Sequence, residues 1–293
     1  MVIVRLKGGL GNQLFQYAFG RAVALLKKDE LFFDLTYLTV NPLNFIPRDF
    51  KLASLKHYQI TDEVTINKFN ALYQIGNGIA ISDRFPKDAI ISALTEVKIK
   101  AAILDGYYQD EFYFLQYASF IQNEVKDFLN RHYKSLSIRN GFLDDDQENV
   151  SIHVRRGDYV LPETMKVHGI CEAGYYKEAI SIMKSKLKNP HFYVFSDDAH
   201  AADRLFNGLL SPDERTNISS VINDTGFSEK DLIEMKVMSD CKHFILANSS
   251  FSWWGSYLSN SAQKIVIAPK KWYHDQDLTY LSDAIGLPSW IRI

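Results

Sequence analysis

The first 35 residues alternate apolar runs with a glycine-rich turn in a way that predicts a βαβ unit. Residues 2–6 form a strand-like run, Val-Ile-Val-Arg-Leu, and Gly8-Gly9-Leu10-Gly11 follows it. Over residues 14–28 the apolar side chains recur at helical spacing, which is typical of an amphipathic helix. Residues 31–35, Leu-Phe-Phe-Asp-Leu, predict a second strand.

The middle of the chain carries a weaker pattern. Asn and Pro in residues 41–47 predict a surface loop, and residues 54–93 give no clear periodicity. Residues 103–110 indicate a strand that ends in an aromatic loop, and residues 112–133 have helical spacing. The polar, acidic stretch 140–146 is the best candidate for a linker between two halves, although such a run is more often a solvated loop.

The second half repeats strand and helix in turn. Apolar strands are predicted at 150–154, 192–195, 244–247 and 265–268, with a further strand at 218–222. Helical stretches separate them, including 175–187 and a helix whose capping box is formed by Ser228 and Asp231. Strands that alternate with helices predict an α/β fold with a mostly parallel sheet.

Polar side chains follow each of these four strands. An arginine pair alone is more often part of a solvated surface than of a site. In an open α/β sheet, however, ligands bind outside the carboxyl ends of the strands, so four polar strand ends are expected to converge. Arg155, Arg156, Ser250 and Ser252 would donate to a phosphate, and Asp197 or Asp198 would accept from a base, as a nucleoside diphosphate requires. The strand ends are Arg155-Arg156-Gly157-Asp158, Ser196-Asp197-Asp198, Asn248-Ser249-Ser250 and Pro269-Lys270-Lys271.

The composition limits the classes of protein to which this chain can belong. A length of 293 residues with 46% hydrophobic residues allows one large or two mid-sized domains. The net charge of -2 argues against a nucleic-acid-binding protein. Cys171 and Cys241 have neither disulfide-framework nor zinc-site spacing, which favours a reducing compartment. The sequence shows no signal peptide and no run of about 18 apolar residues, so we expect a soluble protein, with reversible membrane contact left open.

Three alternative functions remain open at this point. The glycine turn followed by Asp34 resembles a dinucleotide-binding unit and would suit an NAD-dependent oxidoreductase, but Leu14 occupies the position of the third glycine. Asp197 and Asp198 would suit a divalent metal on a diphosphate, which neighbouring arginines make unnecessary. A non-catalytic glycan-binding module is the third alternative.

Four motifs together resemble a known family. Residues 153–159, His-Val-Arg-Arg-Gly-Asp-Tyr, are similar to the H-x-R-R-G-D-Y signature of the inverting α1,2-fucosyltransferases of glycosyltransferase family eleven. The opening Gly8-Gly9-Leu10-Gly11-Asn12-Gln13 segment, the Phe195-Ser196-Asp197-Asp198 strand end and residues 248–255, Asn-Ser-Ser-Phe-Ser-Trp-Trp-Gly, agree with it in the same order. The resemblance spans nearly the whole chain.

The resemblance implies a GT-B-like fold of two Rossmann-like domains with mostly parallel sheets that face a central cleft. Residues 1–146 would form the acceptor-side domain and residues 147–293 the domain that binds GDP-fucose, and the last helix can pack back on the first domain. The reaction would transfer L-fucose from GDP-fucose, with inversion, to the 2-hydroxyl of a terminal β-galactose in an oligosaccharide. No metal or other cofactor is expected.

The resemblance also implies roles for single residues. Arg155 would bind the β-phosphate with Arg156 in support. Asn12 would reach the reacting carbon, and Asp158 is either a general base or a counter-ion for the arginines. The acceptor would contact Gln13, Tyr107 and Tyr108, although tyrosines at a strand end are as often part of the core. For His153, too, a structural role in the core is the more frequent explanation of a buried histidine. The resemblance further implies that His153 and Asp198 face the guanine and that Ser250, Phe251 and Ser252 line the diphosphate. The remaining residues expected to contact GDP-fucose are Ser196, Asp197, Asn248 and Ser249.

A bacterial-type enzyme of this kind would work in the cytoplasm, at the inner face of the membrane. The sequence identifies neither the exact acceptor glycan nor the oligomeric state.

Overall fold

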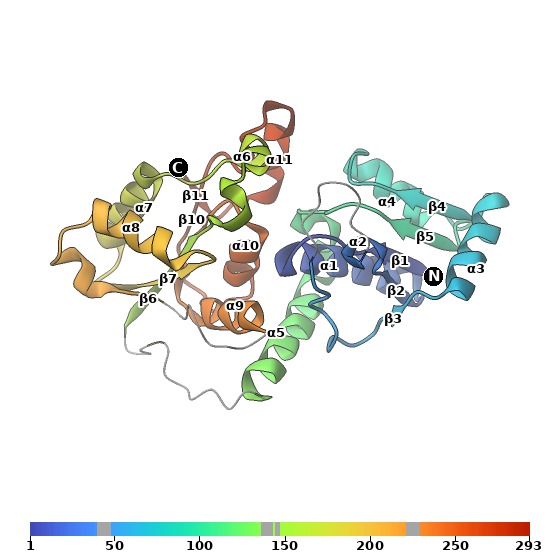
Figure 1. Ribbon diagram of the computed structural model, residues 1–293. Coiled ribbons are helices and arrows are strands. Elements are labelled where there is room, and N and C mark those ends of the chain that lie inside the picture. The colour runs from blue at the N-terminus through green and yellow to red at the C-terminus, as the bar shows by residue number, and fades with distance from the viewer. Residues whose placement is uncertain (40–47, 136–142, 144–146, 221–228) are drawn as a thin grey trace. The chain divides into compact units, whose positions relative to one another are not determined.

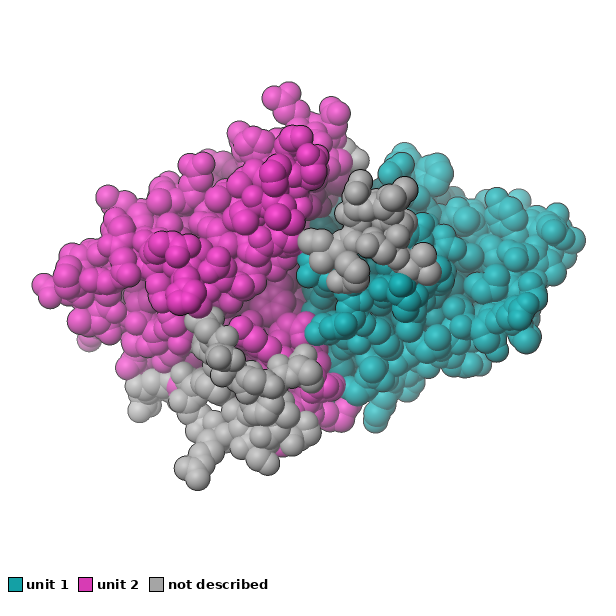
Figure 2. Space-filling model, in the orientation of Figure 1, with its two compact units in different colours: residues 1–128 teal, residues 129–293 magenta. Residues whose placement is uncertain are grey.

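The computed structural model describes residues 1–39, 48–135, 143, 147–220 and 229–293. The chain forms two compact units, Met1–Phe128 (unit 1) and Leu129–Ile293 (unit 2), which Figure 2 colours separately. The division falls inside helix α5 (Ala118–Ser135), whereas the sequence places it after residue 146. The predicted loop at 41–47 and all of the predicted linker except Leu143 lie outside the described residues.

Unit 1 is built on a parallel sheet with the strand order β3-β2-β1-β5-β4 (Figure 1). Helix α1 (Leu10–Lys27) joins β1 to the parallel strand β2, so the predicted βαβ unit is confirmed. The strands are β1 (Val2–Arg5), β2 (Leu31–Asp34), β3 (Gln59–Ile60), β4 (Gly78–Ile81) and β5 (Ala101–Leu104).

The centre and the edges of this sheet differ in burial. Val2, Ile3 and Val4 of β1 are fully buried, as expected for a central parallel strand covered on both faces. Gly20 lets α1 approach β1, because a Cβ atom there would lie 2.3 Å from Val4 Cγ2. Both residues of the edge strand β3 are exposed. Low burial at the edges explains why residues 54–93 show little pattern, although they form β3, β4, α3 (Glu63–Gln74) and α4 (Lys87–Thr95).

Unit 2 is built on a second parallel sheet with the order β11-β10-β9-β6-β7-β8. The strands predicted at 150–154, 192–195, 244–247 and 265–268 are present, and the strand predicted at 218–222 begins at Ile218. The two-residue strand β11 was missed because it is too short to show periodicity. The strands are β6 (Glu148–Val154), β7 (Pro190–Ser196), β8 (Ile218–Ser220), β9 (His243–Ile245), β10 (Val266–Ala268) and β11 (Ile291–Arg292).

The helices of unit 2 cover its sheet. Helices α7 (Ala173–Lys186) and α8 (Ala199–Leu209) share one core cluster with β6 and β7, and α9 (Lys230–Asp240) packs on α10 (Ser250–Tyr257). Ser228, the predicted cap of α9, lies outside the described residues. The last helix, α11 (Thr279–Ile285), belongs to unit 2, where the Ile285 carbonyl accepts a 2.7 Å hydrogen bond from Trp253 Nε1.

Short elements complete the chain. They include α2 (Thr36–Thr39), α6 (Pro162–His168) and a 3-10 turn at Gly157–Val160. Cys171 and Cys241 are both buried and unpaired. None of the helices in the described part of the chain has the length and apolarity needed to cross a bilayer.

Candidate functional site

Each sheet has one point where the strand order reverses. In unit 2 the chain runs outward from β6 through β7 and β8, and then returns to place β9 on the other side of β6. Loops that leave β6 and β9 therefore diverge and leave a crevice at the carboxyl edge, which is where open α/β sheets bind ligands. Arg155 follows β6, and the N-terminus of α10 follows β9. The structure thus places the arginine motif and the serine motif on either side of one crevice.

Arg155 is the charged centre of this crevice. Its guanidinium donates to Asp158 and forms an ion pair with Asp197, with 2.7 Å between Nη1 and Oδ2. The same group lies over the ring of Tyr159, 4.9 Å from its centroid. The side chain keeps 22% of its surface exposed. Two carboxylates and one ring thus hold a partly accessible guanidinium in place, as a preorganised phosphate donor requires.

Arg156 has a different role from its neighbour. Its side chain is buried and donates to the backbone carbonyls of Arg155 (2.9 Å) and Cys171 (3.0 Å). Its backbone N–H donates to Asp197 Oδ1 at 2.8 Å. At Gly157, φ is +20° and a Cβ atom would lie 2.3 Å from Asp197 Oδ2, so only glycine fits. Arg156 therefore fixes the loop that presents Arg155, in line with the supporting role expected from the sequence.

His153 and Phe251 lie together behind the arginines. Their ring centroids are 5.5 Å apart, and His153 is 4% exposed. Burial, with a smaller effect of Arg155, lowers the pKa of His153 to about 3, so the imidazole is neutral. Its Nδ1 atom has no hydrogen-bond partner in the described part of the chain. The end of β6 and the first turn of α10 therefore bring these two rings together.

Asp197 and Asp198 are not equivalent. Asp197 is engaged by both arginines, through an ion pair with Arg155 and a hydrogen bond from the backbone N–H of Arg156. Asp198 is the N-cap of α8, and its Oδ1 accepts from Ala201 N at 2.9 Å. Ser196 is buried and its hydroxyl donates to the carbonyls of Val154 (2.8 Å) and Asp198 (2.9 Å). Ser196 therefore shapes the strand end and offers no free donor to a ligand.

In the serine motif, residues 248–252, some side chains are buried against the backbone and others lie at the start of α10. Asn248 is 2% exposed and its Nδ2 donates to the His168 carbonyl at 2.8 Å. Ser252 is fully buried and donates to the Ala247 carbonyl. The sequence predicts that Asn248 and Ser252 contact the diphosphate. In the structure their side chains bond to backbone carbonyls instead, so they form part of the wall of the crevice. Ser249 caps α10 by accepting from Phe251 N, and Ser250 begins the helix at half-buried depth.

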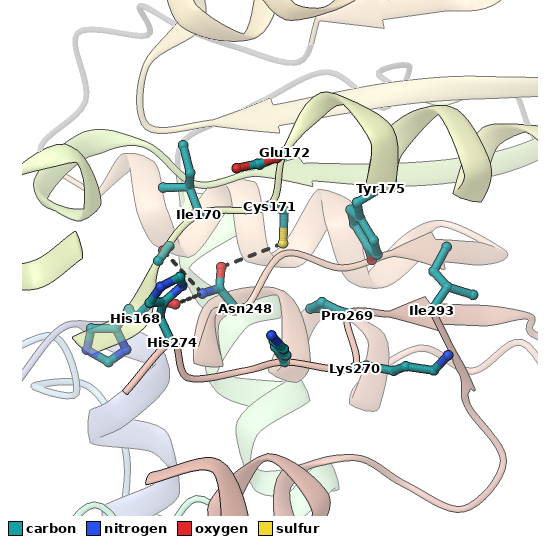
Figure 3. A pocket seen from close by; sticks show the side chains of 12 residues that line it. His168, Ile170, Cys171, Glu172, Tyr175, Asn248, Pro269, Lys270, His274 and Ile293 are labelled. Atoms are coloured by element: carbon teal, nitrogen blue, oxygen red, sulfur yellow. Dashed lines mark hydrogen bonds between the residues drawn. The ribbon is translucent and has the colours of Figure 1, made fainter. Parts of the chain in front are cut away.

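A cavity of about 330 Å³ lies beside Asn248 (Figure 3). Its walls come from the α6–α7 segment and from the segment after β10, a different set of residues from those around Arg155. His168 links the two regions, because its ring stacks on Tyr159 with centroids 4.8 Å apart. Sequence reasoning missed His168, which carries no motif. The cavity is lined by His168, Gly169, Ile170, Cys171, Glu172, Tyr175, Asn248, Pro269, Lys270, Lys271, His274 and Ile293.

The reversal point of unit 1 lies between β1 and β5. Asn12 follows the glycine turn, and its Oδ1 accepts from Gln109 Nε2 at 2.6 Å, so the loops after both strands meet. Gly8 has φ +79°, and a Cβ atom there would lie 2.5 Å from Asn12 Nδ2. The turn therefore needs glycine to hold Asn12, which is half-buried.

Two of the three residues expected to contact an acceptor lie in the interior. Gln13 is fully buried, and its amide donates to the carbonyls of Gly8 (2.8 Å) and Asp49 (2.9 Å). Tyr108 is 1% exposed and its hydroxyl donates to the Ile81 carbonyl. Both are corrected to structural roles, since their polar groups serve the backbone. Tyr107 remains half-buried, with Lys7 Nζ 5.1 Å from its ring centroid.

The contacts of Asp34 argue against the alternative of a dinucleotide-binding oxidoreductase. Its carboxylate is 5% exposed, accepts from Arg5 Nε at 2.9 Å and also accepts from Thr36 N at 3.0 Å. A ribose would have to displace Arg5, so the acidic residue of a dinucleotide site is not available here. Within the described ranges, no three His, Cys, Asp or Glu side chains are grouped so that they could hold a metal ion.

Comparison with known proteins places the chain in a family. Residues 92–293 match the sequence profile of glycosyl transferase family 11. The chain is 32% identical to an alpha-1,2-colitosyltransferase of Escherichia coli, over 100% of this chain and 99% of that protein. It is 28% identical to the Escherichia coli O-antigen biosynthesis glycosyltransferase WbnK, over 98% of this chain and 99% of that one.

A solved structure supports the fold. The structure of an Arabidopsis thaliana FUT1 mutant in complex with GDP superimposes with a TM-score of 0.51 at 14% sequence identity, covering 90% of this chain and 69% of that one. Two parallel α/β units and this likeness confirm the predicted GT-B architecture. The family match and the full-length similarity show that this chain is a glycosyltransferase that belongs to glycosyl transferase family 11.

Proposed function

We propose that this glycosyltransferase moves L-fucose from GDP-fucose, with inversion, to the 2-hydroxyl of a terminal β-galactose, without a metal ion. The observation that carries the proposal is Arg155, a braced and partly exposed guanidinium at the reversal point of the unit 2 sheet. Rat galactoside alpha-(1,2)-fucosyltransferase 2, 28% identical over 49% of this chain and 39% of its own length, supports the choice of sugar and linkage.

In the proposed reaction the bond between fucose C1 and the β-phosphate oxygen breaks, and its electron pair stays on GDP. The galactose 2-oxygen bonds to C1 from the opposite face and releases its proton to solvent water. Arg155 stabilises the charge that develops on the leaving diphosphate, assisted by the N-terminus of α10 at Ser250. Because Asp158 is bonded to Arg155, the geometry supports its role as a counter-ion more than as a general base.

Colitose is a second candidate for the transferred sugar. The full-length similarity to an alpha-1,2-colitosyltransferase favours it. Colitose is L-fucose without the 3-hydroxyl, so one site can discriminate the two only through groups near that position. A donor site that hydrogen-bonds the 3-hydroxyl would reject colitose strongly, whereas an apolar site would discriminate weakly.

Release of GDP on mixing the enzyme, GDP-fucose and a β-galactoside such as lactose tests the proposal, and NMR of the product identifies the linkage. We expect equal rates with and without EDTA. Loss of activity on chelation would contradict the metal-independent reaction, and a product linked elsewhere than at the 2-hydroxyl would contradict the linkage. Competition between GDP-fucose and GDP-colitose, read as the ratio of the two kcat/KM values, decides the sugar.

A further inference from the structure

His168, the last residue of α6, belongs to a series of stacked rings that ends at Arg155. Its ring stacks on the ring of Tyr159, with the centroids 4.8 Å apart and the planes at 16° to each other. The ring of Tyr273 lies 5.4 Å from that of His168, at an angle of 35°. The guanidinium carbon of Arg155 lies over the ring of Tyr159, 4.9 Å from its centroid. Tyr159, His168 and Tyr273 thus form an aromatic column that ends against the charged group of the crevice.

Asn248 fixes the segments that carry the aromatic column. The three rings come from the 3-10 turn after β6, from the end of α6 and from the segment after β10. The Asn248 carbonyl accepts a 3.3 Å hydrogen bond from the Tyr159 hydroxyl. Its side-chain amide donates to the carbonyl of His168 (2.8 Å; Figure 3) and to that of Trp272 (3.3 Å). Because Asn248 is 2% exposed, the column is anchored in the interior of unit 2.

The carboxylates and the aromatic column restrain Arg155 in different directions. Asp158 and Asp197 bond to different terminal nitrogens of the guanidinium, Nη2 and Nη1. These contacts hold its edge but allow the group to tilt about the line between the two nitrogens. The ring of Tyr159 opposes that tilt through the attraction between a cation and an aromatic face. The stacked ring of His168 in turn keeps the Tyr159 ring from moving away.

Neither His168 nor Tyr159 places a charge beside Arg155. Burial lowers the pKa of His168, an effect that Asp158 opposes and Arg155 reinforces, so the imidazole is neutral at neutral pH. Burial raises the pKa of Tyr159 to about 12, so its hydroxyl stays protonated. The column therefore supports the guanidinium without repelling it and without cancelling the positive charge that a diphosphate would meet.

We propose that His168 is a positioning residue, which holds Arg155 in place at the leaving diphosphate by supporting the ring of Tyr159. The role rests on the proposed function, since the exact position of Arg155 matters only if a diphosphate leaves beside it. Such support has a large effect on rate, because a displacement of about 1 Å at a reacting centre can slow a reaction about 100-fold. His168 lies outside the four motifs that the sequence singles out.

Steady-state release of GDP from GDP-fucose and lactose by variants of the full chain tests the proposal. We expect His168→Ala to lower kcat about 10-fold and to leave the KM for lactose within about twofold, because the displaced group serves the leaving group and not the acceptor. His168→Phe keeps an aromatic face against Tyr159 and should recover most of the lost kcat. His200→Ala on α8, an exposed histidine, is the matched control and should behave like the wild type.

A double-mutant cycle separates positioning from a purely structural role. If His168 acts through Arg155, His168→Ala should change kcat by less than about twofold in an Arg155→Ala background, whereas a general loss of structure would lower kcat by the same factor in both backgrounds. Should His168→Ala fail to fold, Tyr159→Leu, with Tyr159→Phe as its conservative partner, gives the same comparison.

Two outcomes would overturn the positioning role and leave the GDP-fucose donor intact: an unchanged kcat in His168→Ala, or equal losses of kcat in the two backgrounds. A wild type that releases GDP from neither GDP-fucose nor GDP-colitose would overturn the proposed function, and the positioning role with it.

Discussion

The two sheets share a topology but differ at the point where the strand order reverses. In unit 2 the strand before that point, β6, contains buried polar residues, Ser151 and His153, and leads into two arginines. In unit 1 the corresponding strand, β1, buries only Val2, Ile3 and Val4, and leads into a glycine turn with neutral amides. The same architecture therefore carries an adjacent arginine pair at this edge in unit 2, and a glycine turn beside the ion-paired Arg5 and Lys7 in unit 1.

The difference shows how charge is arranged for different ligands. Arg155 pairs with the carboxylates of Asp158 and Asp197 through different guanidinium nitrogens and keeps 22% of its side-chain surface exposed. In unit 1, Arg5 and Lys7 both bond to Asp105, at 2.9 Å each, so its cations are committed to a carboxylate at the strand ends. We infer that unit 2 suits a charged donor and that unit 1 suits an uncharged acceptor sugar.

Arg155→Ala should have the largest effect. Loss of one preorganised donor to developing charge lowers kcat by about 100- to 1000-fold. Steady-state GDP release measures the loss, with the melting temperature as a check on folding. Arg204→Ala on α8, an exposed arginine, is the control and should retain full activity. An Arg155→Ala enzyme with near-normal kcat would remove the distinction between the two edges.

Arg156→Ala should act mainly on stability. It removes two hydrogen bonds to carbonyls and leaves the buried Cys171 carbonyl without this donor. Charged hydrogen bonds contribute about 1.5–3 kcal/mol, so the free energy of unfolding in urea should fall by about 2–3 kcal/mol. Unchanged stability combined with lost activity would instead make Arg156 a direct phosphate ligand.

Asn12→Ala tests the glycine turn that follows β1 in unit 1. Removing its amide should raise the KM for the galactoside about 10-fold, in line with the loss of one or two hydrogen bonds, and leave the Kd for GDP unchanged. Asn67→Ala on α3, an exposed asparagine, serves as the control. A weakened affinity for GDP would mean that unit 1 contributes to the donor site.

The pH dependence of stability should distinguish the buried polar strand β6 from the apolar strand β1. Because the folded pKa of His153 is about 3 and the unfolded value is near 6.5, the unfolded chain binds more protons between these values. Stability therefore falls as pH decreases below about 6.5, by roughly 1 kcal/mol at pH 5.5 from this residue. His153→Gln should flatten that part of the curve in urea unfolding. An unchanged slope would show that His153 is not held neutral.

Much of the fold was readable because buried parallel strands are continuous apolar runs. The strands β1, β2, β6, β7, β9 and β10 and the helices α1 and α7 lie close to their predicted positions. The edge strands β3 and β11 were not found, since two-residue strands carry no period. The sequence also could not locate a unit division inside α5, because one amphipathic helix continues across it.

For the site, the sequence named the residue types and the structure assigned their roles. Asn248, Ser252, Gln13 and Tyr108 look available in the sequence, but their polar groups are used by backbone atoms from distant segments. His168 looks unremarkable in the sequence because its significance comes from its stacking on Tyr159. Exposure and hydrogen-bond partners are tertiary properties.

The sequence by itself determined the α/β class, the family and the placement of Arg155 at a strand end, since these depend on local periodicity and on contiguous motifs. The family resemblance already distinguished Arg155 from Arg156, but only the tertiary structure gave the physical difference, because the two residues differ in what lies around them rather than in their chemistry. Local patterns specify elements, whereas the environment of a charge is set by every segment that surrounds it.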